Sequence, residues 1–200
     1  MKRSLLLVLT FLVSMPIYAL SRDTFQASMR KLWEEHVTWT RLYIVSAAAG
    51  LPDTQATAQR LLDNQRDIGN AVAEFYGKDA GDKLTSLLRD HILTAADLVM
   101  AAKAGDQAKM AAAKKKWYAN ANDIAAFLHG ANPNNWPLAT LQSAMKTHLD
   151  QTLDEASHQL HHDYPASIKD YDAIESHILM MADVLSSGII KQFPKKFDRA

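Results

Sequence analysis

Four histidines lie in the middle of long, apolar, helix-forming segments, and these are the residues of the chain whose type and spacing could do chemistry. Two of them, His91 and His177, begin near-copies of one phrase, His-Ile-Leu-Thr-Ala-Ala-Asp and His-Ile-Leu-Met-Met-Ala-Asp. His36 and His148 hold comparable positions in their own segments. An imidazole buried without a partner costs free energy, and a neutral imidazole is a common metal ligand. The pattern therefore indicates a shared polar centre inside the fold.

Two aspartates belong to an internal sequence repeat that precedes two of the histidines. Residues 64–68 read Asn-Gln-Arg-Asp-Ile before His91, and residues 120–124 read Asn-Ala-Asn-Asp-Ile before His148, with Asp-to-His separations of 24 and 25 residues. Two antiparallel helix pairs of one design would place an Asn, an Asp and a His at similar depth. Asn64 and Asn120 lie one turn before the aspartates and are predicted to orient the ligands. The six predicted ligands are His36, Asp67, His91, Asp123, His148 and His177.

This set of side chains suits a transition-metal ion. Imidazole and carboxylate together serve zinc, iron, manganese or copper, whereas calcium and magnesium prefer oxygen ligands alone. Helical bundles often build such sites in their interior, and haem held without a covalent bond is a weaker option there. The protein would then store, carry or sense metal, or use it in a reaction. No nucleophile paired with a base stands out, so the sequence leaves open whether it is an enzyme.

A metal-free interpretation explains the same residues. Each histidine could be hydrogen-bonded to a neighbouring Asp, Asn or Thr, so that a buried polar network fixes how the helices pack. The protein would then be a structural or interaction module that works through its exposed surface. Removal of His91 would change stability only.

The elements that must position these side chains are six amphipathic helices. Apolar residues recur with helical spacing and are interrupted by glycine and proline, as expected for helices joined by short loops. No alternating pattern typical of strands is found. The sequence predicts an all-α, up-and-down bundle with an internal two-helix repeat, in one domain over residues 20–200, with helices at 22–49, 54–76, 79–104, 107–129, 138–162 and 166–192.

Composition narrows the partners and the compartment. There are 22 basic and 22 acidic residues and no cysteine, which excludes disulfides, thiolate metal sites and covalent c-type haem, and predicts no nucleic-acid partner. Lys2 and Arg3 precede a short apolar run and Ala19, the pattern of a signal peptide over residues 1–19 that is cut after Ala19. We therefore expect a periplasmic or secreted protein with no stable membrane span after cleavage.

A second histidine group lies near the end of the fifth predicted helix. Glu155-Ala-Ser-His158 matches the Glu-x-x-His element of di-iron bundles, but those proteins need two such elements and further glutamates. We expect Glu155 at the surface. His158, His161 and His162 are expected to be solvated side chains at a helix end.

Several segments are similar to a family of small bacterial helical proteins of uncharacterised function, and the likeness spans nearly the whole mature chain. Members are sometimes labelled glycosyltransferases or acetylglutamate kinases, yet this sequence has no glycine-rich phosphate loop and no alternation of strands with helices. The resemblance implies the fold and supplies no mechanism. The segments that carry it are 32–41 (Leu-Trp-Glu-Glu-His-Val-Thr-Trp-Thr-Arg), Asn64 with Asp67, 75–77 (Phe-Tyr-Gly), 116–118 (Lys-Trp-Tyr), 123–124 (Asp-Ile) and 192–194 (Gln-Phe-Pro).

Overall fold

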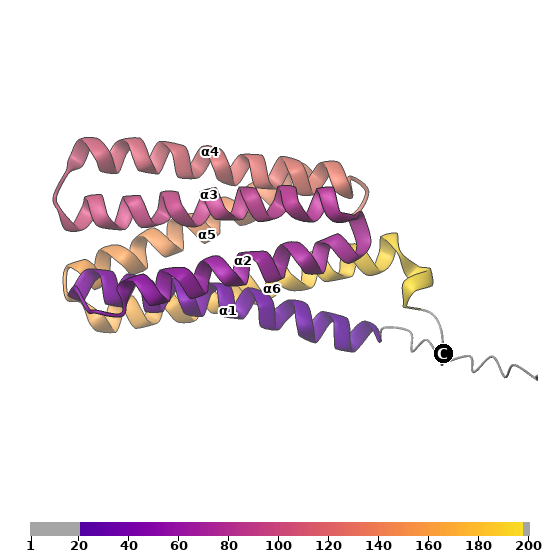
Figure 1. Cartoon of the computed structure of the whole chain (residues 1–200), viewed down its shortest axis with the longest axis horizontal. Helices are drawn as coiled ribbons and strands as arrows, with labels where there is room; N and C mark the ends of the chain where they lie inside the picture. The colour runs from indigo at the N-terminus through magenta and orange to yellow at the C-terminus, as the bar shows by residue number, and fades with distance from the viewer. Residues whose placement is uncertain (1–20, 198–200) are drawn as a thin grey trace, which may run out of the picture.

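The computed structural model describes residues 21–197, which form six α-helices and one short 3-10 helix (Figure 1). The predicted all-α bundle is confirmed. The expected signal peptide, residues 1–19, lies outside the described residues. The helices are α1 (Arg22–Ala49), α2 (Thr54–Tyr76), α3 (Lys78–Lys103), α4 (Gln107–Ala131), α5 (Leu138–Leu160) and α6 (Tyr164–Gln192), followed by η1 (Pro194–Lys196).

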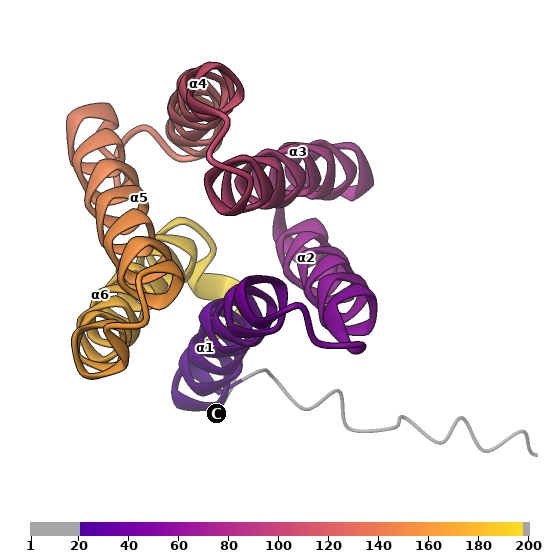
Figure 2. The ribbon, with the colours of Figure 1, turned by 90° about the vertical axis from the view of Figure 1, so that its left-hand side faces the viewer.

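The six helices follow one another around a ring, each packed against the next, and α6 packs back against α1 to close it (Figure 2). The α1–α2, α3–α4 and α5–α6 loops lie together at one end of the bundle (Figure 1). We call this the loop end. Because the apolar stripe of each helix faces the axis of the ring, the side chains in the middle of the helices meet there.

The helix ends follow local capping chemistry, which also explains where the predicted ranges were wrong. The Ser21 hydroxyl accepts a hydrogen bond from the backbone of Thr24 at the start of α1, and Gly50 ends that helix with φ of 68°. Helix α6 begins two residues earlier than predicted, because Pro165 fits the first turn of a helix rather than separating two helices. Helix α5 ends two residues earlier, and His162 turns the chain with φ of 63°.

The end of the bundle opposite the loop end is filled by aromatic side chains, and we call it the aromatic end. The rings of Phe75 and Phe197 are stacked with their centroids 5.6 Å apart, and the ring centroid of Phe25 lies 5.2 Å from that of Phe197. Trp136, from the α4–α5 connection, is almost completely buried, and its indole lies so close to Gly188 that a Cβ there would be 2.0 Å from Nε1. This end of the bundle is therefore tightly packed.

Helix α6 is long and apolar enough to cross a membrane by length and composition, with a mean hydropathy of 1.3 in its most apolar stretch. It is the one such helix among residues 21–197. In the bundle, its buried face packs against α1 and α5. That packing explains its apolar character in this fold.

Candidate functional site

Three of the four predicted histidines meet at the middle of the bundle. His36 of α1, His91 of α3 and His148 of α5 are all buried, and we call them the cavity histidines. The ring centroid of His148 lies 6.0 Å from that of His36 and 6.3 Å from that of His91. Three helices that are distant in sequence thus bring their imidazoles to one level of the bundle.

Both ring nitrogens of His91 are used by protein hydrogen bonds. Nδ1 lies 2.9 Å from the Asn120 side-chain oxygen, and Nε2 accepts a hydrogen bond of 3.2 Å from the Trp117 indole N–H. Nε2 is therefore unprotonated and Nδ1 carries the proton, so the ring is a neutral imidazole. No lone pair is left for a metal ion. Asn120, predicted to orient a metal ligand, contacts His91 at the nitrogen that carries the proton.

The other two cavity histidines are not satisfied in this way. Nδ1 of His36 and Nδ1 of His148 are buried and have no hydrogen-bond partner among the described residues. A buried polar atom left without a partner costs about 1–3 kcal/mol. These two rings therefore keep a hydrogen-bonding capacity that the described residues do not use.

The electrostatic environment keeps the cavity histidines uncharged. Burial, with repulsion from His91, lowers the pKa of His36 to about 3, and burial lowers the pKa of His91 to about 4. Burial and the neighbouring imidazoles lower the pKa of His148 well below its ordinary value. All three rings are neutral near pH 7, so they offer hydrogen bonds rather than positive charge.

His177, the fourth predicted ligand, does not join the other three rings and instead binds the backbone. Its Nε2 donates to the carbonyl oxygen of Ala144 on α5, at 2.9 Å. That carbonyl lies one turn before His148, and the same arrangement occurs twice more around the ring. In each case, a side chain of the next helix donates to the carbonyl one turn before a cavity histidine: Asn64 to Leu32, Asn120 to Leu87 and His177 to Ala144. We call these contacts the three carbonyl bridges.

The two predicted aspartate ligands lie on the outside of the bundle. Asp67 and Asp123 are exposed, whereas Asn64 and Ile68 on the same helix as Asp67 are fully buried. Residues four apart share a face of an α-helix more closely than residues three apart, so the asparagine and the isoleucine take the inward stripe and leave the aspartate outside. Placing these carboxylates at the centre was wrong. Among the residues the structure describes, no group of three or more His, Asp or Glu side chains could hold a metal ion.

A cavity of about 600 Å³ extends from the cavity histidines toward the loop end. Side chains of α1 to α5 line it, and on α1 the lining runs from His36 to Ala48. At 1.5 Å per helical residue, that distance is about 18 Å. The cavity is thus elongated along the bundle, with the histidines at its floor.

Small side chains and one oblique helix create this space. Figure 1 shows α5 crossing the bundle at an angle, so that its C-terminal half moves away from α4. The buried apolar residues form a large cluster that includes the aromatic end and a separate small cluster that includes Tyr43 and Val99 beside the cavity. Six alanines line the cavity where larger side chains would fill a core: Ala48, Ala58, Ala95, Ala96, Ala102 and Ala156.

The cavity reaches solvent at the loop end, and basic side chains surround its mouth. Lys103, His161 and His162 are exposed and belong to the lining. The ammonium group of Lys103 donates to the carbonyl oxygen of Ala47 at 2.6 Å, which fixes it across the mouth between α3 and α1. No Asp or Glu side chain belongs to the lining formed by the described residues.

No family model, curated protein or solved structure matches the chain. The function is therefore argued from the site itself, and the family resemblance of its segments stays an expectation.

A buried ion pair lies between α1, α5 and α6. Arg41 Nη1 contacts Glu155 Oε1 at 2.6 Å, and the same nitrogen donates to the carbonyl oxygen of Ser167 at 3.2 Å. Glu155 is only 1% exposed, so placing it at the surface was wrong. Burial raises the pKa of Glu155 to about 7, although Arg41 opposes the shift. This pair joins three helices and does not line the cavity.

Proposed function

We propose that this protein binds a small, elongated and mostly apolar molecule in the cavity between α1 and α5. The observation that carries the proposal is the cavity of about 600 Å³, which has mostly apolar walls and whose lining includes His36 and His148, two neutral histidines that each have a buried ring nitrogen without a partner among the described residues. Ligand sites for small molecules typically enclose about 300–1,000 Å³ and combine apolar walls with a few convergent polar groups.

The cavity histidines suit the uncharged polar group of such a ligand. His36 and His148 are neutral and lack hydrogen-bond partners at Nδ1, so they could bind a carbonyl or hydroxyl group at the floor. A buried carboxylate would be less favourable there, because neutral imidazoles do not compensate a buried negative charge.

The remaining lining supports binding rather than a reaction. The hydroxyls of Thr40 and Thr152 donate to the carbonyl oxygens of His36 and His148, both at 2.8 Å, so no imidazole activates them. Nucleophilic catalysis needs a nucleophile within hydrogen-bond reach of a base. A carrier, a store or a sensor of the ligand is therefore the function that these contacts support best. If residues 1–19 are a signal peptide, the protein would do this outside the cytoplasm.

The metal centre expected from the sequence is the weaker candidate. Of its six predicted ligands, Asp67 and Asp123 are exposed, His91 uses both of its nitrogens and His177 binds a backbone carbonyl. His36 and His148 alone would leave a transition-metal ion short of protein ligands.

The test uses the mature chain without a histidine tag and an uncharged, environment-sensitive fluorophore, N-phenyl-1-naphthylamine. Two variants on α2 form a matched pair, because Ala58 lines the cavity and Ala56 is exposed two residues away. We expect saturable binding by the unmodified chain and by Ala56→Trp, and at least tenfold weaker binding by Ala58→Trp.

Two results would overturn the proposal. One is an unmodified chain that does not bind the fluorophore, or that binds it equally well with Trp at position 58. The other is near-stoichiometric zinc, iron, manganese or copper in the purified protein that disappears in a folded His148→Ala variant. The second result would restore the metal centre.

A further inference from the structure

The mouth of the cavity differs chemically from its floor, and this difference bears on the class of ligand. The floor carries neutral imidazoles, whereas the mouth carries the ammonium group of Lys103 with His161 and His162. The walls between them are mostly apolar and include no carboxylate among the described residues. The site is therefore polarised along its length, with its positive charge at the solvent end.

From this polarity we infer that the ligand is a single-chain amphiphile, whose mostly apolar chain fills the cavity, with any polar group that it places at the histidine floor uncharged, and whose anionic head lies at the mouth against Lys103. The inference rests on the proposed function, because it assigns the chemistry of the molecule that the cavity would bind. Carboxylate and phosphate heads share the required chemistry, and a free fatty acid and a lysophospholipid are their respective sources.

Lys103 is placed to act on such a head group. One N–H of its ammonium group binds the Ala47 carbonyl oxygen, which holds the side chain at the mouth and leaves the other two N–H groups for a ligand. The acidic side chain of Asp106 in the adjacent loop is already paired with Lys109, at 3.0 Å. Lys103 has no carboxylate partner within the described residues.

The two mouth histidines can add hydrogen bonds to the same head group. Nδ1 of His161 contacts the Ser157 carbonyl oxygen at 2.8 Å, and Nδ1 of His162 contacts the Tyr164 hydroxyl at 2.9 Å. Each contact uses one ring nitrogen and leaves Nε2 without a partner among residues 21–197. The left-handed backbone at His162 turns this short segment across the loop end.

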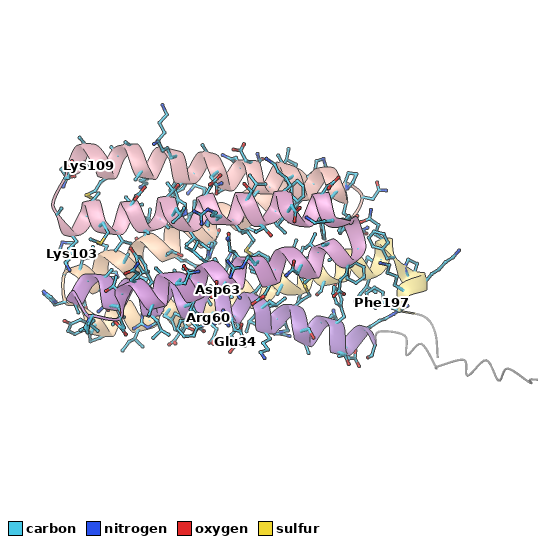
Figure 3. The ribbon with its side chains drawn as sticks, in the orientation of Figure 1. Glu34, Arg60, Asp63, Lys103, Lys109 and Phe197 are labelled. Atoms are coloured by element: carbon cyan, nitrogen blue, oxygen red, sulfur yellow. The ribbon has the colours of Figure 1, made fainter. Side chains whose placement is uncertain are left out.

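The experiment compares ligands that share one chain and differ in the head. Palmitate, hexadecanol and palmitoyl lysophosphatidate, each below its micellar concentration, displace the uncharged fluorophore from the unmodified chain. The variants are Lys103→Met, Lys103→Arg and, as matched control, Lys115→Met. Figure 3 labels Lys103 at the loop end, whereas Lys115 is an exposed residue of α4 that does not line the cavity.

We expect palmitate to bind more tightly than hexadecanol. Lys103→Met should weaken palmitate binding about tenfold, as for the loss of one charge-assisted hydrogen bond, and leave hexadecanol binding unchanged. Lys103→Arg and Lys115→Met should keep the preference for the anion, and salt should weaken it in the unmodified chain. Tighter binding of the lysophosphatidate supports the inference with phosphate as the head.

Equal binding of palmitate and hexadecanol, or a preference that survives in Lys103→Met, would overturn the inference and leave the proposed function in place. A chain that binds neither the fluorophore nor any of the three ligands would instead overturn the proposed function and the inference with it. Helical circular dichroism of each variant establishes that the comparison is made between folded proteins.

Discussion

The clearest physical prediction concerns a single alanine on the cavity wall. Replacing Ala156, which lines the cavity, with leucine adds three carbon atoms where no protein atoms stand. At about 0.8 kcal/mol per buried CH₂, the added burial stabilises the fold by roughly 2 kcal/mol if the leucine enters the cavity without strain. Leucine is also a good helix former, so α5 itself should tolerate the change.

The matched control is the same substitution in the packed part of the core. Ala182 on α6 is completely buried in the large apolar cluster and does not line the cavity. Forcing extra carbon atoms into a filled core costs about 1–3 kcal/mol. The two variants should therefore change the free energy of unfolding in opposite directions.

Urea denaturation followed by circular dichroism measures both effects, provided that the slope of the transition is unchanged. Ala156→Leu should raise the midpoint and Ala182→Leu should lower it. If Ala156→Leu destabilises the protein as much as Ala182→Leu does, the space beside α5 is not a cavity that a side chain can fill. The argument for a ligand would then lose its basis.

Three further predictions concern pH, the buried ion pair and one close contact. The cavity histidines have a lowered pKa in the folded protein, so the unfolded chain binds protons first as pH falls below about 6.5. The free energy of unfolding should therefore drop by about 1.4 kcal/mol per pH unit for each histidine, down to about pH 4. Urea titrations across that pH range measure the drop. Glu155, whose raised pKa acts in the opposite direction between about pH 7 and 4.5, should offset part of that drop. Arg41→Met leaves the Glu155 carboxylate buried without its partner and should lower the free energy of unfolding by about 3 kcal/mol at pH 8. The loss should be smaller at pH 5, where the carboxyl group is protonated. Equal losses at the two pH values would contradict this account. Gly188→Ala should destabilise the protein by about 1–3 kcal/mol because its methyl group would displace the adjacent indole, whereas Gly130→Ala, in open space within α4, should stabilise it slightly in thermal melts.

The helices could be predicted from the sequence because hydrophobic periodicity and helix-stop residues are local signals. Gly50 and Gly77 stand where the chain must leave a helix with positive φ, and both predicted ends were correct. The errors were also local. Pro165 was interpreted as a separator, although it lies in the first turn of α6.

The level at which the histidines meet was also visible in the sequence, since each lies in the middle of its helix. Their partners were not, because a difference of one residue in spacing decides whether a side chain faces inward or outward. Asp67 follows Asn64 by three residues and faces solvent, whereas Ile68 follows by four and is buried. The asparagines, interpreted as supporting residues, are the inward-facing members of the repeat.

The cavity itself had no sequence signal that this reasoning could use. Alanine counts as apolar in a periodicity argument, whether it contacts a neighbouring helix or leaves space before it. The space beside Ala95 and Ala156 depends on the angle at which α5 crosses the bundle, and a helix crossing angle depends on how side chains of different helices pack, which a periodicity argument does not treat. An excess of alanine on the inward faces near the loop end, beside phenylalanine and tryptophan at the other end, is the signal that could have pointed to it.

The three carbonyl bridges have a consequence for selectivity. Asn64, Asn120 and His177 each tie one helix to a fixed carbonyl of its neighbour, so the α1–α2, α3–α4 and α5–α6 pairs are each held in register. His91 at the floor and Lys103 at the mouth both lie on α3, about 18 Å apart at 1.5 Å per residue, so this helix fixes the distance between them. A cavity with a fixed floor and a fixed mouth would select ligands by the length of their chain. A chain that is too short leaves its end unsupported or its head inside, and one that is too long pushes its head into water. The stretch of α3 between His91 and Lys103, in a bundle whose helix pairs the bridges hold in register, would thus set the length of molecule that the protein accepts.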